Sequence, residues 1–252
     1  MDIRKNYNIN GQGIKIGLID TGISNKGFAT DGINLIDNNK DFTDHHCHGT
    51  HISGILKDEK YGVAPSADLY VVKALDKNLN GKIKDIANGV EWLIDKNTDI
   101  ILLPLGTSEN SKELRNVISK ANESNILVVS SIGNYGLNIE VEVLYPAKYK
   151  DVIGVGALSA NGEIWSGTTL GQGLDILLPG QRVKSLSLEG ETLLASGTSM
   201  ASAYMAGFLA LYLEHYNYFD RHEIKEQFFR QMNRLPLINK VRKMETEIFI
   251  KK

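Results

Sequence analysis

Five short apolar runs recur along the chain, and this recurrence constrains the fold more than any other feature. They occupy residues 14–19, 69–75, 100–105, 126–129 and 152–155. Stretches with helical apolar spacing and polar outer faces occupy residues 83–96, 112–124 and 200–216. Nearly continuous apolar strands that alternate with helices are typical of a mostly parallel sheet covered on both faces. The sequence therefore predicts an α/β protein with a single domain and a doubly wound, mostly parallel sheet.

Size and charge restrict the classes of partner. The 252 residues suffice for one large domain, and no repeat, linker or low-complexity segment divides them. With 28 Lys and Arg against 30 Asp and Glu, the formal net charge of -2 gives no case for a nucleic acid or an anionic membrane. The longest apolar run, residues 205–213, is too short to span a bilayer. We therefore expect no nucleic-acid and no membrane partner. We also expect the protein to be a monomer.

The N-terminus and the cysteine content bear on the compartment. The first ten residues contain no apolar segment of the kind that secretory signals carry. Cys47 is the single cysteine, so no internal disulfide can form, which suits a reducing compartment. These observations predict a cytoplasmic protein, secreted only if a leader was removed before residue 1.

Three polar residues are expected near the carboxyl ends of strands, where α/β sheets place their working sites. Asp20 ends the first apolar run in GLIDTGIS, Asn134 follows a later one in LVVSSIGNYG, and Ser199 opens the last helix in SGTSMASAYMAG. Each also has a purely structural interpretation, as an Asx turn, a turn asparagine or a helix N-cap. Asp-Thr-Gly occurs in aspartic proteases as well, but that fold is all-β and needs two copies, whereas this chain has one.

A histidine-rich segment, DHHCHGTHISGIL, precedes the second apolar run. His48 opens a short amphipathic stretch within it. Histidine and cysteine are zinc ligands, but the adjacent residues His45, His46 and Cys47 cannot all face one ion from regular structure. Their spacing matches none of the common zinc motifs. We therefore predict no metal site and no cofactor.

Taken together, four segments resemble the motifs of the subtilisin-like serine proteases, the subtilase family. LIDTGI is similar to the family's aspartate motif, HGTHISG to its histidine motif, SGTSMASAYMAG to its serine motif and SIGNYG to its oxyanion-asparagine motif. The connecting segments YGVAPSADLYVVKAL and YPAKYKDVIGVGAL are similar as well. The motifs also follow the order aspartate, histidine, serine that subtilisin shows. The resemblance covers about residues 14–213 and leaves a C-terminal helix and tail, residues 214–252.

The resemblance implies a serine endopeptidase that works through an acyl-enzyme on a peptide or protein substrate. Ser199 would be the nucleophile, His48 its base, and Asp20 the group that orients the base. Asn134 and the backbone N–H of Ser199 would stabilise the oxyanion. An extended peptide would lie between two segments and beside a strand end. The residues implied in substrate binding are Leu79, Asn80, Gly81, Pro104, Leu105, Gly106, Ser131, Ile132 and Gly133.

Several positions depart from the family's pattern. Pro104 replaces the usual serine and removes a backbone N–H while keeping the carbonyl. Ala203 replaces a proline inside the serine helix. Residues 57–60, KDEK, are shorter than the calcium-binding loop of many secreted relatives and offer too few carboxylates for a tight site. The N-terminus leaves no room for an inhibitory prodomain, so residues 1–252 are expected to be one peptidase domain that folds without autoprocessing or with help from a partner.

Two rival functions and one question of specificity stay open. The fold could serve as a catalytically idle peptide-binding pseudoprotease, or Cys47 and its histidines could sense redox state or metal. As a protease, the chain could remove the leader of one dedicated precursor peptide or degrade proteins generally. For the residue before the scissile bond, Glu140 and Glu142 would favour a basic side chain if they face the cleft. If they face outward, Leu144 and Ile132 would favour a modest apolar one.

Overall fold

One seven-stranded sheet organises residues 8–136 and 141–216, the part of the chain that the computed structural model describes. Its strand order is β2-β3-β1-β4-β5-β6-β7, and every neighbouring pair is parallel. The strands are β1 (Lys15–Asp20), β2 (Ala29–Asn34), β3 (Asp68–Lys73), β4 (Ile100–Leu103), β5 (Leu127–Ser131), β6 (Val152–Leu158) and β7 (Ile176–Pro179). A separate antiparallel hairpin consists of β8 (Val183–Leu186) and β9 (Thr192–Ala195).

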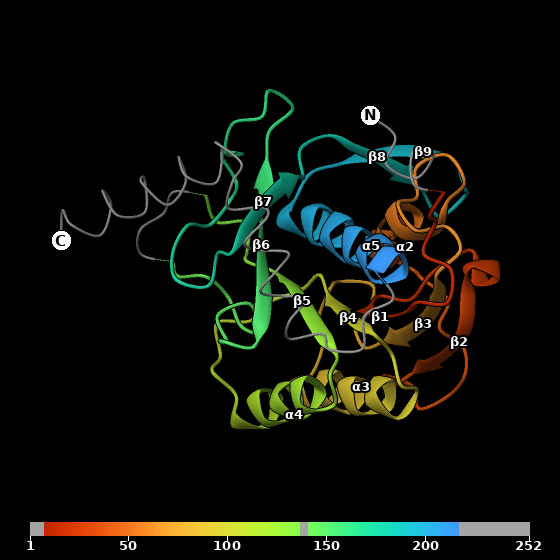
Figure 1. Cartoon of the computed structure of the whole chain (residues 1–252). Helices are drawn as coiled ribbons and strands as arrows, with labels where there is room; N and C mark the ends of the chain where they lie inside the picture. The colour runs from red at the N-terminus through yellow and green to blue at the C-terminus, as the bar shows by residue number, and fades with distance from the viewer. Residues whose placement is uncertain (1–7, 137–140, 217–252) are drawn as a thin grey trace.

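Helices cover both faces of this sheet (Figure 1). The pair α2 (His48–Lys57) and α5 (Thr198–Tyr216) packs on one face. The pair α3 (Ile83–Asp95) and α4 (Lys112–Glu123) packs on the other. A short 3-10 turn, η1 (Lys26–Phe28), precedes β2. The α/β class and the doubly wound parallel sheet predicted from the alternating runs are therefore confirmed.

The strands divide their side chains between two cores because successive residues of a strand point to opposite faces. In β1, Ile16 and Leu18 join the core beneath α2 and α5, whereas Ile19 joins the core above α3 and α4. All three side chains are fully buried. Burial on both faces explains why the central strands are nearly continuous apolar runs.

The edges of the sheet were not predicted from the sequence. β2 has the sequence ATDGIN and is partly exposed at one edge, so no apolar run marks it. β7 is a four-residue strand at the opposite edge. β4 ends at Leu103, earlier than the predicted residue 105, because Pro104 has no N–H to continue the ladder.

Sheet order brings three strand ends to one place. β1, β4 and β5 are neighbours, and their carboxyl ends carry Asp20, Pro104 and Ser131 to the same edge. The first turn of α5 lies at this edge, since Gly133 N–H donates to the Thr198 hydroxyl at 3.3 Å. The fold therefore gathers the predicted site residues where an α/β sheet places its ligands.

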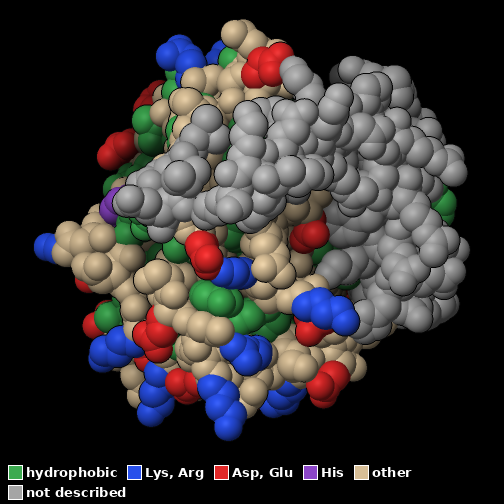
Figure 2. Space-filling view, turned by 90° about the vertical axis from the view of Figure 1, so that its left-hand side faces the viewer, with side chains coloured by type: hydrophobic (Ala, Val, Ile, Leu, Met, Phe, Trp, Pro, Cys, Tyr) green, Lys and Arg blue, Asp and Glu red, His purple; other side chains and the backbone are tan. Residues whose placement is uncertain are grey.

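The surface has no dominant charge on the face shown in Figure 2. Among its described residues, Lys and Arg side chains are interspersed with Asp and Glu side chains. This pattern agrees with the net charge of -2. No helix within residues 8–136 and 141–216 combines the length and the apolar character needed to cross a membrane.

Candidate active site

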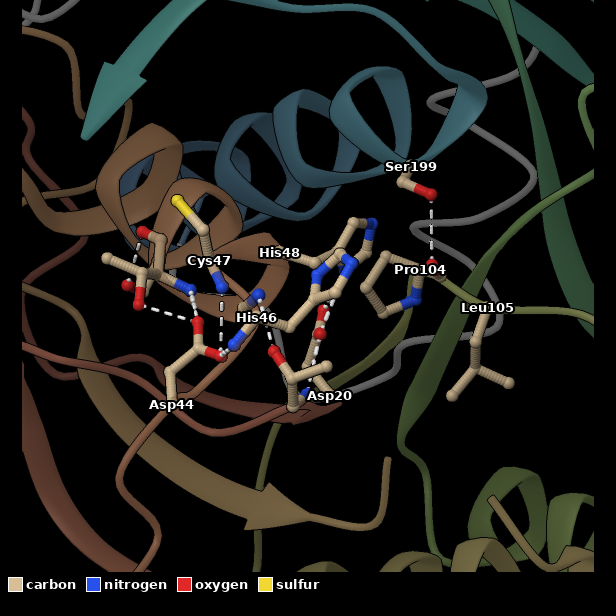
Figure 3. A network of polar contacts seen from close by, with 12 residues as sticks. Asp20, Asp44, His46, Cys47, His48, Pro104, Leu105 and Ser199 are labelled. Atoms are coloured by element: carbon tan, nitrogen blue, oxygen red, sulfur yellow. Dashed lines mark hydrogen bonds and ion pairs between the residues drawn. The ribbon is translucent and has the colours of Figure 1, made fainter. Parts of the chain in front are cut away.

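A histidine and an aspartate from different elements form the centre of the site. Asp20 ends β1 and is fully buried, and His48 is the first residue of α2. The Nδ1 atom of His48 lies 2.8 Å from Oδ1 and 2.9 Å from Oδ2 of Asp20 (Figure 3). Because a carboxylate can only accept, Nδ1 carries the proton and Nε2 is left as the basic nitrogen.

The close approach of α2 to β1 depends on Gly49. A Cβ at this position would overlap the carbonyl oxygen of Gly22 and would contact the Asp20 side chain. The Gly49 N–H also donates to the Thr21 hydroxyl at 3.0 Å. The glycine of the motif HGT therefore lets the helix start against the strand end, where His48 reaches Asp20.

Asp44, which was not singled out from the sequence, organises the turn before His48. Its buried carboxylate accepts from the backbone N–H groups of His46 at 2.8 Å and Thr50 at 2.9 Å, and from that of Cys47 at 3.1 Å. Burial raises the pKa of Asp44, but the hydrogen bonds from Thr50 and His46 outweigh it and hold the pKa below its ordinary value. An acidic residue just before a helix is a capping signal that could have identified this role.

The charge of His48 is set by two opposing effects. Burial lowers the pKa of His48, whereas the charge of Asp20, its hydrogen bond and the more distant charge of Asp44 raise it. The raising effects prevail, so the pKa of His48 lies above its ordinary value. A proton accepted at Nε2 is therefore held more firmly than on a free histidine.

Ser199 is the second residue of α5 and is 8% exposed. Its hydroxyl donates to the carbonyl oxygen of Pro104 at 2.9 Å. Figure 3 shows this hydroxyl pointing toward Pro104, with the His48 ring nearby. A contact with His48 would require the hydroxyl to turn away from Pro104, and a change of χ1 rotamer turns a serine hydroxyl in this way. Such catalytic contacts are often loose in the absence of substrate.

The Asn134 amide is held in one orientation by the start of α5. Its Oδ1 accepts from the Thr198 backbone N–H at 2.9 Å and from the Thr198 hydroxyl at 3.0 Å. Since a backbone N–H can only donate, the atom that faces it must be the amide oxygen. The NH₂ group of Asn134 is therefore directed away from Thr198 and is available to a developing oxyanion beside Ser199.

A groove of about 650 Å³ joins these groups to both predicted binding segments. Two sets of predicted residues line it together with His48 and Ser199: Leu79, Asn80 and Gly81, and Pro104, Leu105 and Gly106. Ser131, Gly133 and Asn134 line it as well.

Ile132 is the one predicted binding residue that the structure separates from this set. Its side chain is fully buried and packs with Val143 and Ala147. Its N–H donates to Val155 and its carbonyl accepts from Leu144. Ile132 therefore supports the groove wall without offering a group to the substrate.

The structure adds an apolar end to the groove that was not predicted. Four aliphatic residues form it: Leu75, Ile83, Ile86 and Leu114. Ile83 and Ile86 lie three residues apart on α3, so they share one face of that helix. The three-residue spacing of these two isoleucines is the sequence signal from which the apolar end could have been predicted.

The loop after α2 bears on the predicted lack of calcium. Asp58 uses its Oδ1 to accept from the backbone N–H groups of Lys60 at 2.9 Å and Tyr61 at 3.0 Å, so the carboxylate closes its own turn. In the described ranges, no cluster of three or more His, Cys, Asp or Glu side chains is arranged to hold a metal ion. We expect EDTA to shift the melting temperature by only a few degrees. A large calcium-dependent rise, measured by calorimetry, would contradict this expectation by revealing a tight site.

Cys47 precedes His48 in a left-handed conformation, with φ at 88°, and its thiol lies 3.9 Å from the Leu186 carbonyl. Burial raises the pKa of the Cys47 thiol, and the charges of Asp44 and Glu189 raise it further. We therefore expect bulky thiol reagents to inhibit slowly at neutral pH and faster as the pH rises, because the thiolate is the reactive form. Cys47→Ser should stay active and resist the reagent in timed activity assays. An inactive Cys47→Ser variant would show that the thiol takes part in the chemistry.

Known proteins resemble this chain along most of its length. The profile of the subtilase family matches residues 11–242. A thermostable alkaline protease of Halalkalibacterium halodurans is 35% identical over 229 residues, which cover 88% of this chain and 63% of that protein. Subtilisin E of Bacillus subtilis is 36% identical over 214 residues, covering 81% of this chain and 56% of the relative. The chain thus spans less than two thirds of the length of these relatives.

A solved structure agrees with the sequence relatives. The crystal structure of a cold-adapted subtilisin-like serine proteinase matches with a TM-score of 0.76 at 29% sequence identity. The match covers 82% of this chain and 77% of that chain. The structural similarity therefore extends over most of this chain.

Proposed function

Because this chain belongs to the subtilase family, we propose that it is a serine endopeptidase with Ser199 as nucleophile and His48 as base. The observation that carries the proposal is a convergence of groups in one groove. The His48–Asp20 hydrogen bond lies beside Ser199 at the start of a buried helix. Asn134 presents its amide at the same place. A nucleophile, a base, a group that orients the base and an oxyanion donor are the parts that acyl transfer requires.

The first half of the proposed reaction forms the acyl-enzyme. Ser199 Oγ attacks the carbonyl carbon of the scissile peptide bond while His48 Nε2 takes the hydroxyl proton. The carbonyl oxygen gains the negative charge and accepts from the Asn134 amide and the Ser199 N–H. The C–N bond then breaks, and the leaving amine takes the proton from His48. The products of this half are a free amine and an ester on Ser199.

The second half restores the enzyme. Water gives a proton to His48 Nε2 and adds to the ester carbonyl, and the same donors stabilise the second oxyanion. When the C–O bond to Ser199 breaks, the serine oxygen recovers its proton from His48. Asp20 stays ionised in both halves and keeps Nδ1 protonated, so Nε2 is the nitrogen that moves the proton.

Pro104 connects substrate binding to this chemistry. An extended peptide that lies along residues 104–106 would place a backbone N–H against the Pro104 carbonyl. That carbonyl accepts the Ser199 hydroxyl when no substrate is bound. Competition for the same acceptor would release the hydroxyl to turn toward His48. Proline keeps this acceptor although it lacks the N–H of an ordinary residue.

Reaction with a fluorophosphonate probe tests the proposal. The probe bonds its phosphorus to an activated serine oxygen and releases fluoride, so labelling reports the nucleophile independently of any substrate. We expect one label per chain, located by mass spectrometry on the peptide that contains Ser199. A chain that stays unlabelled and does not cleave a peptide library is a pseudoprotease instead, and the proposal fails.

The same proposal includes a dedicated role, removal of the leader from a precursor peptide. The apolar end formed by Ile83, Ile86 and Leu114 would favour substrates with an apolar side chain at that place, which adds the selectivity that a dedicated role needs. Cleavage-site profiling on a peptide library tests the role. One dominant cleavage sequence would support the dedicated role. Cleavage at many unrelated sites would contradict it and indicate general protein degradation.

A further inference from the structure

Leu144 lies where two walls of the groove meet. A Cβ built on Gly106 would be 2.8 Å from both Cβ and Cδ1 of Leu144. A Cβ built on Gly133 would be 3.2 Å from its Cγ. The leucine side chain therefore occupies the space that these two glycines leave open between residues 104–106 and residues 131–133.

The backbone around Leu144 is attached to both walls. Its N–H donates to the Ile132 carbonyl at 3.1 Å. The next residue, Tyr145, exchanges two hydrogen bonds of 2.8 Å with Thr107. Because both walls hold this segment, the backbone of Leu144 cannot move out of the space without breaking these bonds.

The position of Leu144 relative to the oxyanion donors defines what it excludes. The Asn134 amide and the Ser199 N–H fix the carbonyl that is attacked. The side chain of that residue branches one bond from this carbonyl, so it has to enter the groove next to Gly133 and Asn134. Gly106, Gly133 and Leu144 line the groove at this point. The leucine thus fills the volume that a large side chain would need there.

The charge of the described groove lining gives no support to the alternative of a basic side chain. Among the described residues that line the groove, none is acidic. Glu142 is 77% exposed and forms an ion pair with Lys148 outside the groove. Glu140, the other carboxylate considered from the sequence, lies outside the described residues.

From this geometry we infer that Leu144 limits the residue before the scissile bond to glycine, alanine or serine. The inference rests on the proposed peptidase function and adds the substrate class. A larger side chain would overlap the aliphatic carbons of Leu144, and tightly packed sites tolerate such overlap poorly. Removal of those carbons should therefore open the site to aromatic residues.

The test compares four peptides that are identical except for Ala, Leu, Phe or Arg before the scissile bond. For the unaltered protein we expect kcat/KM to be at least about tenfold higher with Ala than with Phe. Leu144→Ala should raise the Phe-to-Ala ratio at least about tenfold, because it frees three carbon positions. Ile36→Ala, which removes an exposed aliphatic side chain outside the groove, is the matched control and should leave the ratio unchanged.

The outcomes separate the inference from the function on which it rests. If the unaltered protein cleaves after Phe or Arg as well as after Ala, or if Leu144→Ala leaves the ratio unchanged, the inference is overturned while the peptidase stands. If no peptide is cleaved, aminoalkylphosphonate esters with a methyl or a benzyl side chain replace them. The inference is supported if the ester with the methyl side chain labels Ser199 faster than the ester with the benzyl side chain. Equal or slower labelling by the ester with the methyl side chain overturns it. Absence of labelling by both esters and by the fluorophosphonate overturns the proposed function and the inference together.

Discussion

Ser199→Ala is expected to abolish peptide hydrolysis and leave the fold intact. The substitution removes one oxygen, whose hydrogen bond in the structure goes to the Pro104 carbonyl at the groove. That carbonyl can accept from water instead, so the cost in stability is small. Loss of a nucleophile that works as a unit with its base costs about 10⁶-fold in kcat, a value that comes from subtilisin itself. Activity should therefore fall below detection in a peptide assay, with an unchanged melting temperature.

Ser202→Ala is the matched control for this prediction. Ser202 lies one turn further along α5, is fully buried, and donates its hydroxyl to the Ser199 carbonyl at 2.7 Å. Like Ser199, it lies on α5 and donates its hydroxyl to a backbone carbonyl, but it does not line the groove. We expect it to keep most of the activity. Comparable turnover by Ser199→Ala and the unaltered protein would refute the assignment of the nucleophile.

His48→Ala should remove activity as completely as Ser199→Ala, since without the base the serine hydroxyl is a weak nucleophile. His51 provides the comparison, because it lies on the same helix and is also a histidine. It is 1% exposed, its Nε2 lies 3.4 Å from the Leu193 carbonyl, and burial lowers its pKa. His51→Ala should lower the melting temperature and retain activity at low temperature. An active His48→Ala variant together with an inactive His51→Ala variant would show that the base has been misplaced.

The pH profile gives a second measurement of the same group. His48 has to be neutral to accept the serine proton, so kcat/KM should fall as the pH drops through its pKa. Because the pKa of His48 lies above its ordinary value, this loss should begin at a higher pH than for a free histidine. Asp20→Asn removes the charge that raises the pKa and should move the midpoint to lower pH, with a much reduced rate. A midpoint that stayed in place would mean that another group controls the acidic limb.

The central strands and helices could be predicted because burial leaves a direct record in the sequence. Strands buried on both faces, such as β4 and β5, appear as unbroken apolar runs. β2 and the β8–β9 hairpin leave no such record, because several of their residues are exposed. The bounds of α5, Thr198–Tyr216, agree with the predicted helix and with the expected place of Ser199 in its first turn.

The residues of the proposed site could be named from the sequence, but their contacts could not. Motifs predict Asp20, His48 and Ser199 one at a time, whereas the distances between them depend on the strand order and on the close approach at Gly49. The hydrogen bond from Ser199 to Pro104 depends on a rotamer, which no pattern of residue types records. The same holds for Leu144, because its place against two glycines depends on how the two walls of the groove come together.

The late position of α5 in the chain has a consequence for when activity can arise. This helix follows every strand of the sheet in sequence, yet it packs against β1, β4, β5, β6 and β7. All of these contacts are distant along the chain, and such a topology has a high contact order and folds slowly. During synthesis, the ribosome must release the last described helix before Ser199 can approach His48, its proposed base. A nascent chain would therefore be inert toward its neighbours, and proteolysis would begin only once folding is complete.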